Sequence, residues 1–344
     1  MSIKNLNKYS QDRNIKKSTL DGYKSSLKKY VEFNEMSLDE LIEEALNEEV
    51  IPLKNQTIKK RLVNFRHYLL NSNLTTKTAR TYFSKIIAFY RHYGIEIPIL
   101  PKVSYDKNYE INYFDLPNKR DIKQALDVSS ILIKSIILFM ASSGTAKAET
   151  LSLTVEHFIN ATIGYHHGGS LNEIINELEN KNNIVPSFYL KRIKTNKFYY
   201  TFCTPEATDH IIRYLKTRKN LKLSDKLFDI TDSSLSLKLR QINDNMGWGF
   251  KGKYRFFRSH TLRKFNASNI GLSSEYIDLI QGRGKDELYT TYIKTNPKKL
   301  KSIYESAMHN VEILKSDTKI KKEEFTIVIN IFLSGKEYNI LLDE

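Results

Sequence analysis

Closely spaced prolines constrain this chain more than any other feature, because they separate two stretches of different periodicity. Pro98, Pro101 and Pro117 punctuate a segment with little apolar repetition, which is typical of an extended connection. The chain has 344 residues, more than one small core needs, since a domain commonly holds about 150 residues. The sequence therefore predicts two domains joined by a linker over residues 101–117.

The stretch before the prolines has the pattern of helices alone. Apolar residues recur there at three- or four-residue steps, which places each set on one face of a helix. Four such stripes begin at Leu20, Leu38, Ile58 and Ala79. The pairs Ser18–Asp21 and Ser37–Glu40 have the spacing of capping boxes at helix starts. We expect a compact helical bundle over residues 17–100, preceded by a flexible segment over residues 1–16.

The stretch after the prolines has a mixed pattern. One helix is expected to start near Asn118, and a strongly apolar helix is expected over residues 130–142. Two β-like runs, 187–193 and 197–203, flank the turn Lys194-Thr195-Asn196 and predict a hairpin. Further helices are expected over residues 205–217, 234–244, 262–270, 275–280 and 298–307. A tail over residues 311–344 contains one more β-like run, 325–333, so the fold class is mainly α with a small β-sheet.

Charge points to a polyanionic partner. The chain carries 54 Lys and Arg against 39 Asp and Glu, a net charge of +15. A basic protein gains free energy on a nucleic acid because its cations release counterions from the phosphates. A general compositional bias towards Lys, Asn and Ile would also raise the charge, so composition alone leaves nucleic-acid binding open.

Composition also excludes several classes of protein. The longest apolar stretch, residues 131–141, is interrupted by Lys134 and is shorter than the ~20 residues of a membrane span. The first residues are polar and lack the apolar centre of a secretion signal. Cys203 is the only cysteine, which excludes an intrachain disulfide and a cysteine zinc site. We expect a cytoplasmic protein, and its sequence contains no motif for a metal ion or a nucleotide cofactor.

Two motifs contain cations suited to phosphate chemistry. His260 and Arg263 are three residues apart, so they share a helix face and pair a titratable ring with a guanidinium that can hold two phosphate oxygens. Upstream, Ser143-Gly144 breaks a helix and is followed by Lys147 and Glu149.

Two further motifs complete an ordered set. Lys194 lies on the expected hairpin, between the two motifs above. After them comes Gly282-Arg283, followed nine residues later by Tyr292. Each motif is common by chance, and only the order of all four is specific.

Taken in order, the four motifs resemble those of the tyrosine recombinase (integrase) family. The segment from Asn296-Pro297 to Leu300 and Tyr304 is similar to its archaeal branch. The resemblance covers residues 17–310. It implies a SAM-like, DNA-binding core-binding domain over residues 17–100 and an α+β catalytic domain over residues 118–310. It also implies that the tail, residues 311–344, is exchanged between subunits or folds back on its own domain.

The resemblance assigns a role to each motif residue. Tyr292 would be the nucleophile that attacks a DNA phosphodiester, giving a 3′-phosphotyrosyl enzyme and a free 5′-hydroxyl. Lys147, His260 and Arg263 would hold the nonbridging oxygens, and Lys194 would protonate the leaving oxygen. Arg283 would add a hydrogen bond to the phosphate. The covalent link conserves the bond energy, so neither metal nor nucleotide is required.

Two positions depart from the family pattern. Lys147 stands where the family has an arginine, and Arg283 stands where it has histidine or tryptophan. Lysine keeps the charge but lacks the planar fork of arginine. The alternatives are a weakened or inactive DNA-binding relative and a type IB topoisomerase.

Two of the assigned roles have rival residues nearby. Tyr289 competes with Tyr292 for the role of nucleophile, because a helical turn would place both on one face. Lys191 or Lys197 could take the place of Lys194 on the hairpin.

The implied partner is double-stranded DNA containing attachment sites. The resemblance implies a tetramer on DNA and a monomer off it, acting for a provirus or another mobile element. Lys77, Arg80 and Lys85 interrupt the apolar stripe of the fourth expected helix, and we expect them to contact the DNA backbone.

Overall fold

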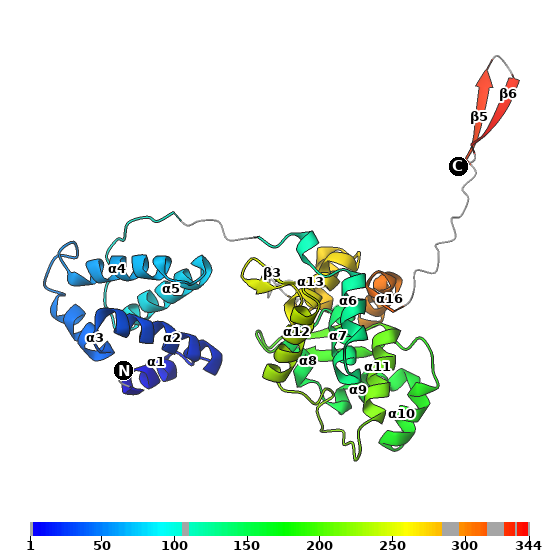
Figure 1. Ribbon diagram of the computed structural model, residues 1–344, viewed down its shortest axis with the longest axis horizontal. Helices are drawn as coiled ribbons and strands as arrows, with labels where there is room; N and C mark the ends of the chain where they lie inside the picture. Colours follow the sequence, from blue (N-terminus) through cyan, green and yellow to red (C-terminus); the bar gives the residue numbers. More distant parts are fainter. Residues whose placement is uncertain (1–2, 105–109, 284–295, 315–326, 334–335, 343–344) are drawn as a thin grey trace. The chain divides into compact units, whose positions relative to one another are not determined.

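The structure is a computed structural model that describes residues 3–104, 110–283, 296–314, 327–333 and 336–342. The chain divides into two compact units, Met1–Glu110 and Ile111–Glu344 (Figure 1). Most described residues are helical, and the strands form two-stranded antiparallel sheets. The expected fold class, mainly α with a small β component, is confirmed.

The first unit is a helical bundle. Its helices are α1 (Ile3–Asp12), α2 (Lys17–Asn34), α3 (Leu38–Asn47), α4 (Thr57–Asn71) and α5 (Thr76–His92). The helices α2, α4 and α5 pack against one another around buried aromatic residues that include Tyr30, Phe65 and Phe89. The expected capping box at the start of α3 is present, with Glu40 N donating to Ser37 Oγ over 3.2 Å.

The start of the chain differs from the expected flexible segment over residues 1–16. Residues 3–12 form α1, and Leu6 and Tyr9 lie in the core of the first unit. The Tyr9 ring lies 5.0 Å from that of Tyr23 and 5.4 Å from that of Phe89. The Ser18 capping box does not form, because α2 begins one residue before it. The segment is otherwise mostly polar, and the helix is stabilised by the packing of Leu6 and Tyr9 against residues distant in sequence.

The second unit contains the remaining helices and strands. The helices are α6 (Lys119–Asp127), α7 (Ile131–Ser143), α8 (Lys147–Ser152), α9 (Val155–Ala161), α10 (Leu171–Glu179), α11 (Pro205–Lys216), α12 (Asp232–Asn245), α13 (Ser259–Asn269), α14 (Ser274–Ile280) and α16 (Pro297–Ala307). The strands are β1 (Ser187–Lys191), β2 (Phe198–Phe202), β3 (Phe250–Lys251), β4 (Tyr254–Arg255), β5 (Ile327–Leu333) and β6 (Lys336–Leu342). Short 3₁₀ turns cover Tyr113–Asp115, Ile163–Tyr165 and Met308–Val311. No helix in the described ranges is both long enough and apolar enough to span a bilayer.

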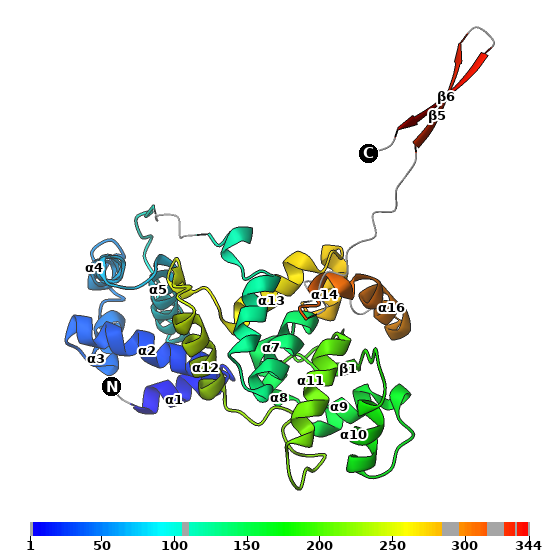
Figure 2. The ribbon, with the colours of Figure 1, turned by 45° about the vertical axis from the view of Figure 1, so that its right-hand side comes forward.

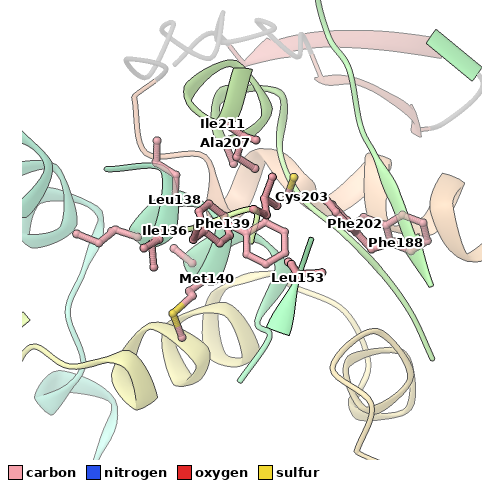
Figure 3. Close-up of a cluster of buried hydrophobic side chains, with 14 of the residues drawn as sticks. Ile136, Leu138, Phe139, Met140, Leu153, Phe188, Phe202, Cys203, Ala207 and Ile211 are labelled. Atoms are coloured by element: carbon pink, nitrogen blue, oxygen red, sulfur yellow. The ribbon is translucent and has the colours of Figure 1, made fainter. Parts of the chain in front are cut away.

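The helix α7 lies at the centre of this unit. It is apolar on nearly all faces, and a helix of this kind is stable only when it is covered all round. It packs against α11 and α13, which flank it in Figure 2. Figure 3 shows its side chains meeting those of β1, β2 and α11, and the Phe139 ring lies 5.3 Å from that of Phe188. The carboxyl end of α7, at Gly144, is therefore held inside the unit.

The hairpin of β1 and β2 is present as expected. Its register runs from Ser187 opposite Phe202 to Lys191 opposite Phe198. Arg192 closes the ladder, because its N–H donates to the Lys197 carbonyl over 2.7 Å. Asn196 adopts the left-handed conformation that such turns need, with φ at 59°. The turn therefore holds residues 192–197 at the exposed end of the hairpin, where Lys191 and Phe198 are both open to solvent.

The carboxyl-terminal tail differs from the expected single β-like run. The strand β5 pairs with β6 of the same chain, from Ile327 opposite Leu342 to Leu333 opposite Lys336. The second strand was missed because its run begins with Lys336 and Glu337, which are uncommon in strands. Glu206 fixes the beginning of the tail, since its carboxylate accepts from the N–H groups of Ile313 and Leu314 over 2.6 and 2.7 Å.

Candidate active site

A basic cavity of about 550 Å³ opens beside α13 in the second unit. Its lining residues are Ile111, Asn112, Tyr113, Leu116, Arg192, His260, Arg263, Lys264, Ala267, Ser268 and Arg283. None of these described lining residues is acidic, whereas five carry or can carry a positive charge. The cavity therefore suits an anionic group.

Arg263 is the buried centre of this site, with 4% of its surface exposed. Its Nη1 donates to the Gly144 carbonyl over 2.5 Å, and its Nη2 donates to the Gln281 carbonyl over 2.9 Å. These bonds join the end of α7 to the end of α14. Burial lowers the pKa of Arg263 to about 10, and the neighbouring charges of Arg192 and Arg283 act in the same direction.

Asn266, one turn further along α13, repeats this link. Its amide donates to the carbonyls of Ala141 and Ser142 over 3.1 and 2.7 Å. Its Oδ1 accepts from Gln281 Nε2 over 2.7 Å. The two polar residues fix one face of α13 against the end of α7, which keeps the cavity wall rigid.

His260 lies one turn before Arg263 and also lines the cavity. The residue as a whole is exposed to solvent. Desolvation, together with the nearby charges of Arg258 and Lys264, lowers the pKa of His260 to about 4. The ring is therefore neutral at neutral pH and can accept a proton or a hydrogen bond.

Arg283 reaches the cavity from the turn that ends α14. Its N–H donates to the Asp278 carbonyl over 2.7 Å. Gly282 has φ at +63°, and a Cβ at this position would lie 2.7–2.9 Å from ring carbons of Tyr199. Glycine is needed here both for the backbone and for the space, so the Gly282-Arg283 pair is a structural unit. Burial lowers the pKa of Arg283.

Arg192 is a site residue that the motif comparison did not select. Its Nη1 donates to the Gln281 carbonyl over 3.0 Å, and the residue lines the cavity. Alternation along β1 could have identified it, because successive side chains point to opposite faces of a strand. Phe188 and Leu190 are buried, so Arg192 shares their inward face.

Lys147 does not line the cavity. Its ammonium lies 2.8 Å from both carboxylate oxygens of Asp232 and 3.0 Å from Ser236 Oγ. Both partners belong to α12. The ammonium of Lys147 is therefore bound by an acidic side chain in the first turn of α12, and the residue is not among those that line the cavity with His260 and Arg263.

Lys194 lies in the hairpin turn, and Glu149 stabilises that turn. Lys194 is exposed and is not among the cavity-lining residues of the described chain. Glu149 is buried, and its Oε1 accepts from the Ile193 N–H over 3.3 Å. The glutamate of the first motif thus fixes the turn on which Lys194 lies.

Tyr292 and its rival Tyr289 lie outside the described residues. The described chain ends at Arg283 in the cavity and resumes at Asn296 before α16. The buried Tyr304 of α16 donates to the Ser142 carbonyl over 3.1 Å.

The residues expected to contact DNA lie on α5 of the first unit. Lys77 and Arg80 are exposed and line a surface groove of about 440 Å³ with Thr81 and Ser84. Lys85 differs, because its ammonium lies 5.5 Å from the centre of the Tyr23 ring. Its charge is held by a cation–π contact within the unit.

The described residues contain no group of three or more His, Cys, Asp or Glu side chains placed to hold a metal ion. The adjacent pair His166 and His167 has other partners. His166 Nε2 contacts the Ile159 carbonyl at 3.1 Å, and His167 Nδ1 lies 2.6 Å from Glu177 Oε1.

Comparison with known proteins identifies the fold. No protein-family model matches the chain, and no curated protein matches its sequence. A lambda integrase tetramer bound to a Holliday junction matches with a TM-score of 0.55 and 12% identity, over 85% of this chain and 76% of that chain. A lambda integrase (75–356) dimer bound to a COC′ core site matches with a TM-score of 0.52 and 12% identity, over 85% and 98% of the two chains.

A third structure comes from a transposon. The Tn1549 transposon integrase (aa 82–397), in complex with circular intermediate DNA, matches with a TM-score of 0.50 and 12% identity, over 85% and 95% of the two chains. The fold of this chain therefore matches that of tyrosine recombinases.

Proposed function

We propose that this chain is a site-specific DNA recombinase of the tyrosine type. One observation carries the proposal: Arg192, His260, Arg263 and Arg283 converge on a single cavity that has no acidic residue among its described lining. A phosphodiester is the anion that such a cluster suits, because guanidinium groups match the geometry of phosphate oxygens. The matching fold adds support, since the solved structures that share it are integrases bound to DNA.

The chemistry proceeds by attack of a tyrosine hydroxyl on a DNA phosphate. A bond forms between the Tyr292 oxygen and phosphorus, and the bond from phosphorus to the 5′-oxygen breaks. The phenol releases its proton to water, and the 5′-oxygen takes a proton from Lys194. The product is a 3′-phosphotyrosyl enzyme with a free 5′-hydroxyl, and reversal with a second 5′-hydroxyl joins the new strand.

Cationic side chains and the N–H donor of the neutral His260 ring stabilise the transition state of this step. Negative charge increases on the nonbridging oxygens, and preorganised donors in a partly buried site stabilise it without reorganisation. Arg263 and His260 hold these oxygens, and Arg283 donates one further hydrogen bond. The step needs neither metal nor nucleotide.

The biological role follows from the same proposal. Double-stranded DNA attachment sites are the partner, and the enzyme assembles as a tetramer on them. The motif similarity supports an archaeal-type enzyme acting for a provirus or another mobile element. Association with the nucleoid follows from DNA binding.

Covalent capture tests the function and finds the target sequence in the same experiment. The protein is incubated with duplexes that have randomised interiors and a nick at successive positions, and complexes that survive denaturant are isolated and sequenced. The expected result is a recurring sequence bound covalently by the wild type and not by Tyr292→Phe. Tight binding of the duplexes without any covalent complex would contradict the proposed recombinase activity.

A second candidate is an inactive DNA-binding relative, and the pairing of Lys147 with Asp232 favours it. This candidate predicts tight DNA binding without covalent capture. A type IB topoisomerase would instead relax supercoiled plasmid without preference for the captured sequence, and parallel relaxation assays separate it from a recombinase.

A further inference from the structure

Arg192 and Arg263 lie close together because both bind one carbonyl. Arg192 Nη1 and Arg263 Nη2 donate to the Gln281 oxygen over 3.0 and 2.9 Å. The two guanidinium groups come from the β1–β2 hairpin and from α13, which are far apart in sequence. Together with Arg283 they form a cluster of three arginines around the cavity.

Such a cluster is electrostatically unfavourable without an anion. The charges of Arg192 and Arg283 both lower the pKa of Arg263, after the larger effect of burial. Like charges in a partly buried site repel one another, and the described cavity lining offers no carboxylate. The buried Glu149 offsets part of this repulsion, because its charge acts on the pKa of Arg263 in the opposite direction. A bound phosphate would attract all three guanidinium groups and so offset their mutual repulsion.

The position of Lys147 leaves the phosphate-contacting role of the first-motif cation without a residue. Its ammonium is bound by Asp232 and Ser236 on α12, and it is not among the residues that line the cavity. A lysine in an ion pair of this kind cannot contact a phosphate without breaking that pair. Arg192, in contrast, uses Nη1 for Gln281 and presents the rest of a planar donor fork beside the cavity.

We propose that Arg192 is the second guanidinium that contacts the scissile phosphate, in place of Lys147. This inference rests on the proposed function and adds a residue to its site. Arg192 donates to one nonbridging oxygen, and Arg263, beside it, donates to the other. The Gln281 carbonyl sets the distance between them, so the two arginines act as one clamp.

The first test compares cleavage of two substrates by matched variants. Arg192→Ala, Arg192→Lys, Lys147→Ala and Arg213→Ala are assayed on the captured duplex and on the same duplex with a methylphosphonate at the scissile position. Arg213 is an exposed arginine on α11 that does not line the cavity, so its variant controls for loss of one charge.

The expected result separates contact from structure. Arg192→Ala should slow covalent complex formation by about 10²–10³-fold on the phosphodiester, the usual effect of losing one transition-state donor. It should slow the reaction much less on the methylphosphonate, because that phosphate has already lost the charge that Arg192 neutralises. Arg192→Lys should be intermediate, and Lys147→Ala should resemble Arg213→Ala. Equal loss on both substrates, or a larger loss in Lys147→Ala, would overturn the assignment.

The second test does not depend on cleavage. Inorganic phosphate, compared with chloride at equal ionic strength, should raise the Tm of the wild type and of Arg213→Ala but not that of Arg192→Ala. An equal rise in Arg192→Ala would overturn the role of Arg192. Phosphate protection that needs Arg192, in a wild type that forms no covalent complex, would retain the phosphate site and overturn only the recombinase function.

Discussion

Arg192 and Arg263 donate to the same carbonyl oxygen, that of Gln281, from the hairpin and from α13. This shared acceptor fixes two guanidinium groups at one wall of the cavity, and Gly282-Arg283 follows directly after it in the chain. The geometry of the site therefore depends on the turn at the end of α14. Substitutions at Arg263, Gly282 and His260 test this geometry, and substitutions on α5 test DNA binding by the first unit.

Replacing Arg263 with Lys is expected to destabilise the fold as well as the chemistry. A lysine cannot reach both the Gly144 and the Gln281 carbonyl, and leaving one buried acceptor unpaired costs about 1–3 kcal/mol. Urea denaturation of the full chain measures this free energy of unfolding. Arg213→Ala, an exposed control, should change it by less than about 0.5 kcal/mol. Equal stability of the two variants would mean that Arg263 does not fix the site.

Replacing Gly282 with Ala is expected to lower the free energy of unfolding by more than the strain of the positive φ alone would. A residue other than glycine at positive φ costs on the order of 1–3 kcal/mol, and the new Cβ would also collide with the Tyr199 ring. Gly247 provides a matched control, because its φ is +66° and a Cβ there would meet nothing within 4 Å. The unfolding free energies of Gly282→Ala and Gly247→Ala should differ, and the difference measures the contact with Tyr199. Equal losses would show that the turn can move away from the ring.

The histidine is expected to make the fold sensitive to acid. Because the pKa of His260 is lowered to about 4, the unfolded chain binds a proton more readily than the folded protein does. Above the ordinary histidine pKa the ring is neutral in both states and costs the fold nothing. As the pH falls from that value towards 4, the unfolded chain takes up the proton first, so the free energy of unfolding decreases. His260→Gln, which cannot take up this proton, should lose less stability between pH 7 and pH 4.5 than the wild type. An NMR titration of the wild type with a His260 midpoint near the ordinary value would contradict the burial and charge effects.

Changes on α5 are expected to alter DNA affinity through the number of phosphate contacts. If Lys77 and Arg80 each neutralise one phosphate, Lys77→Gln with Arg80→Gln should reduce the slope of log affinity against log salt by about 1.8, at roughly 0.9 per contact. Lys85→Gln should have a smaller effect, because its ammonium packs on Tyr23. Fluorescence anisotropy with one duplex over a series of salt concentrations measures the slopes. A Lys85 effect as large as that of Lys77 would assign the DNA-contacting surface to a different face of α5.

Local patterns predicted much of the fold. The apolar run of α7, the Ser37–Glu40 capping box and the β1–β2 hairpin depend on neighbours within a few residues, so spacing alone identifies them. The helix α1 and the strand β6 were missed, because each is stabilised by partners that a local window does not include.

The site was predictable only in part, for a related reason. The helical spacing of His260 and Arg263 places them together whatever the rest of the chain does. The pairing of Lys147 with Asp232 and the contact of Arg192 with Gln281 join residues more than 80 positions apart. Spacing within a motif has no information about such contacts, so Lys147 was selected and Arg192 was not.

The most direct test of the central claim is the identity of the residue that becomes bound to DNA. The captured covalent complex is trimmed with nuclease and digested with trypsin, and the modified peptide is fragmented in a mass spectrometer. Cleavage after Lys285 and Lys294 gives a peptide over residues 286–294 that contains both Tyr289 and Tyr292, so fragmentation must locate the nucleotide. The account predicts the added mass on Tyr292, with Tyr289→Phe still forming the adduct. A nucleotide on Tyr289, or on a residue outside this peptide, would contradict it.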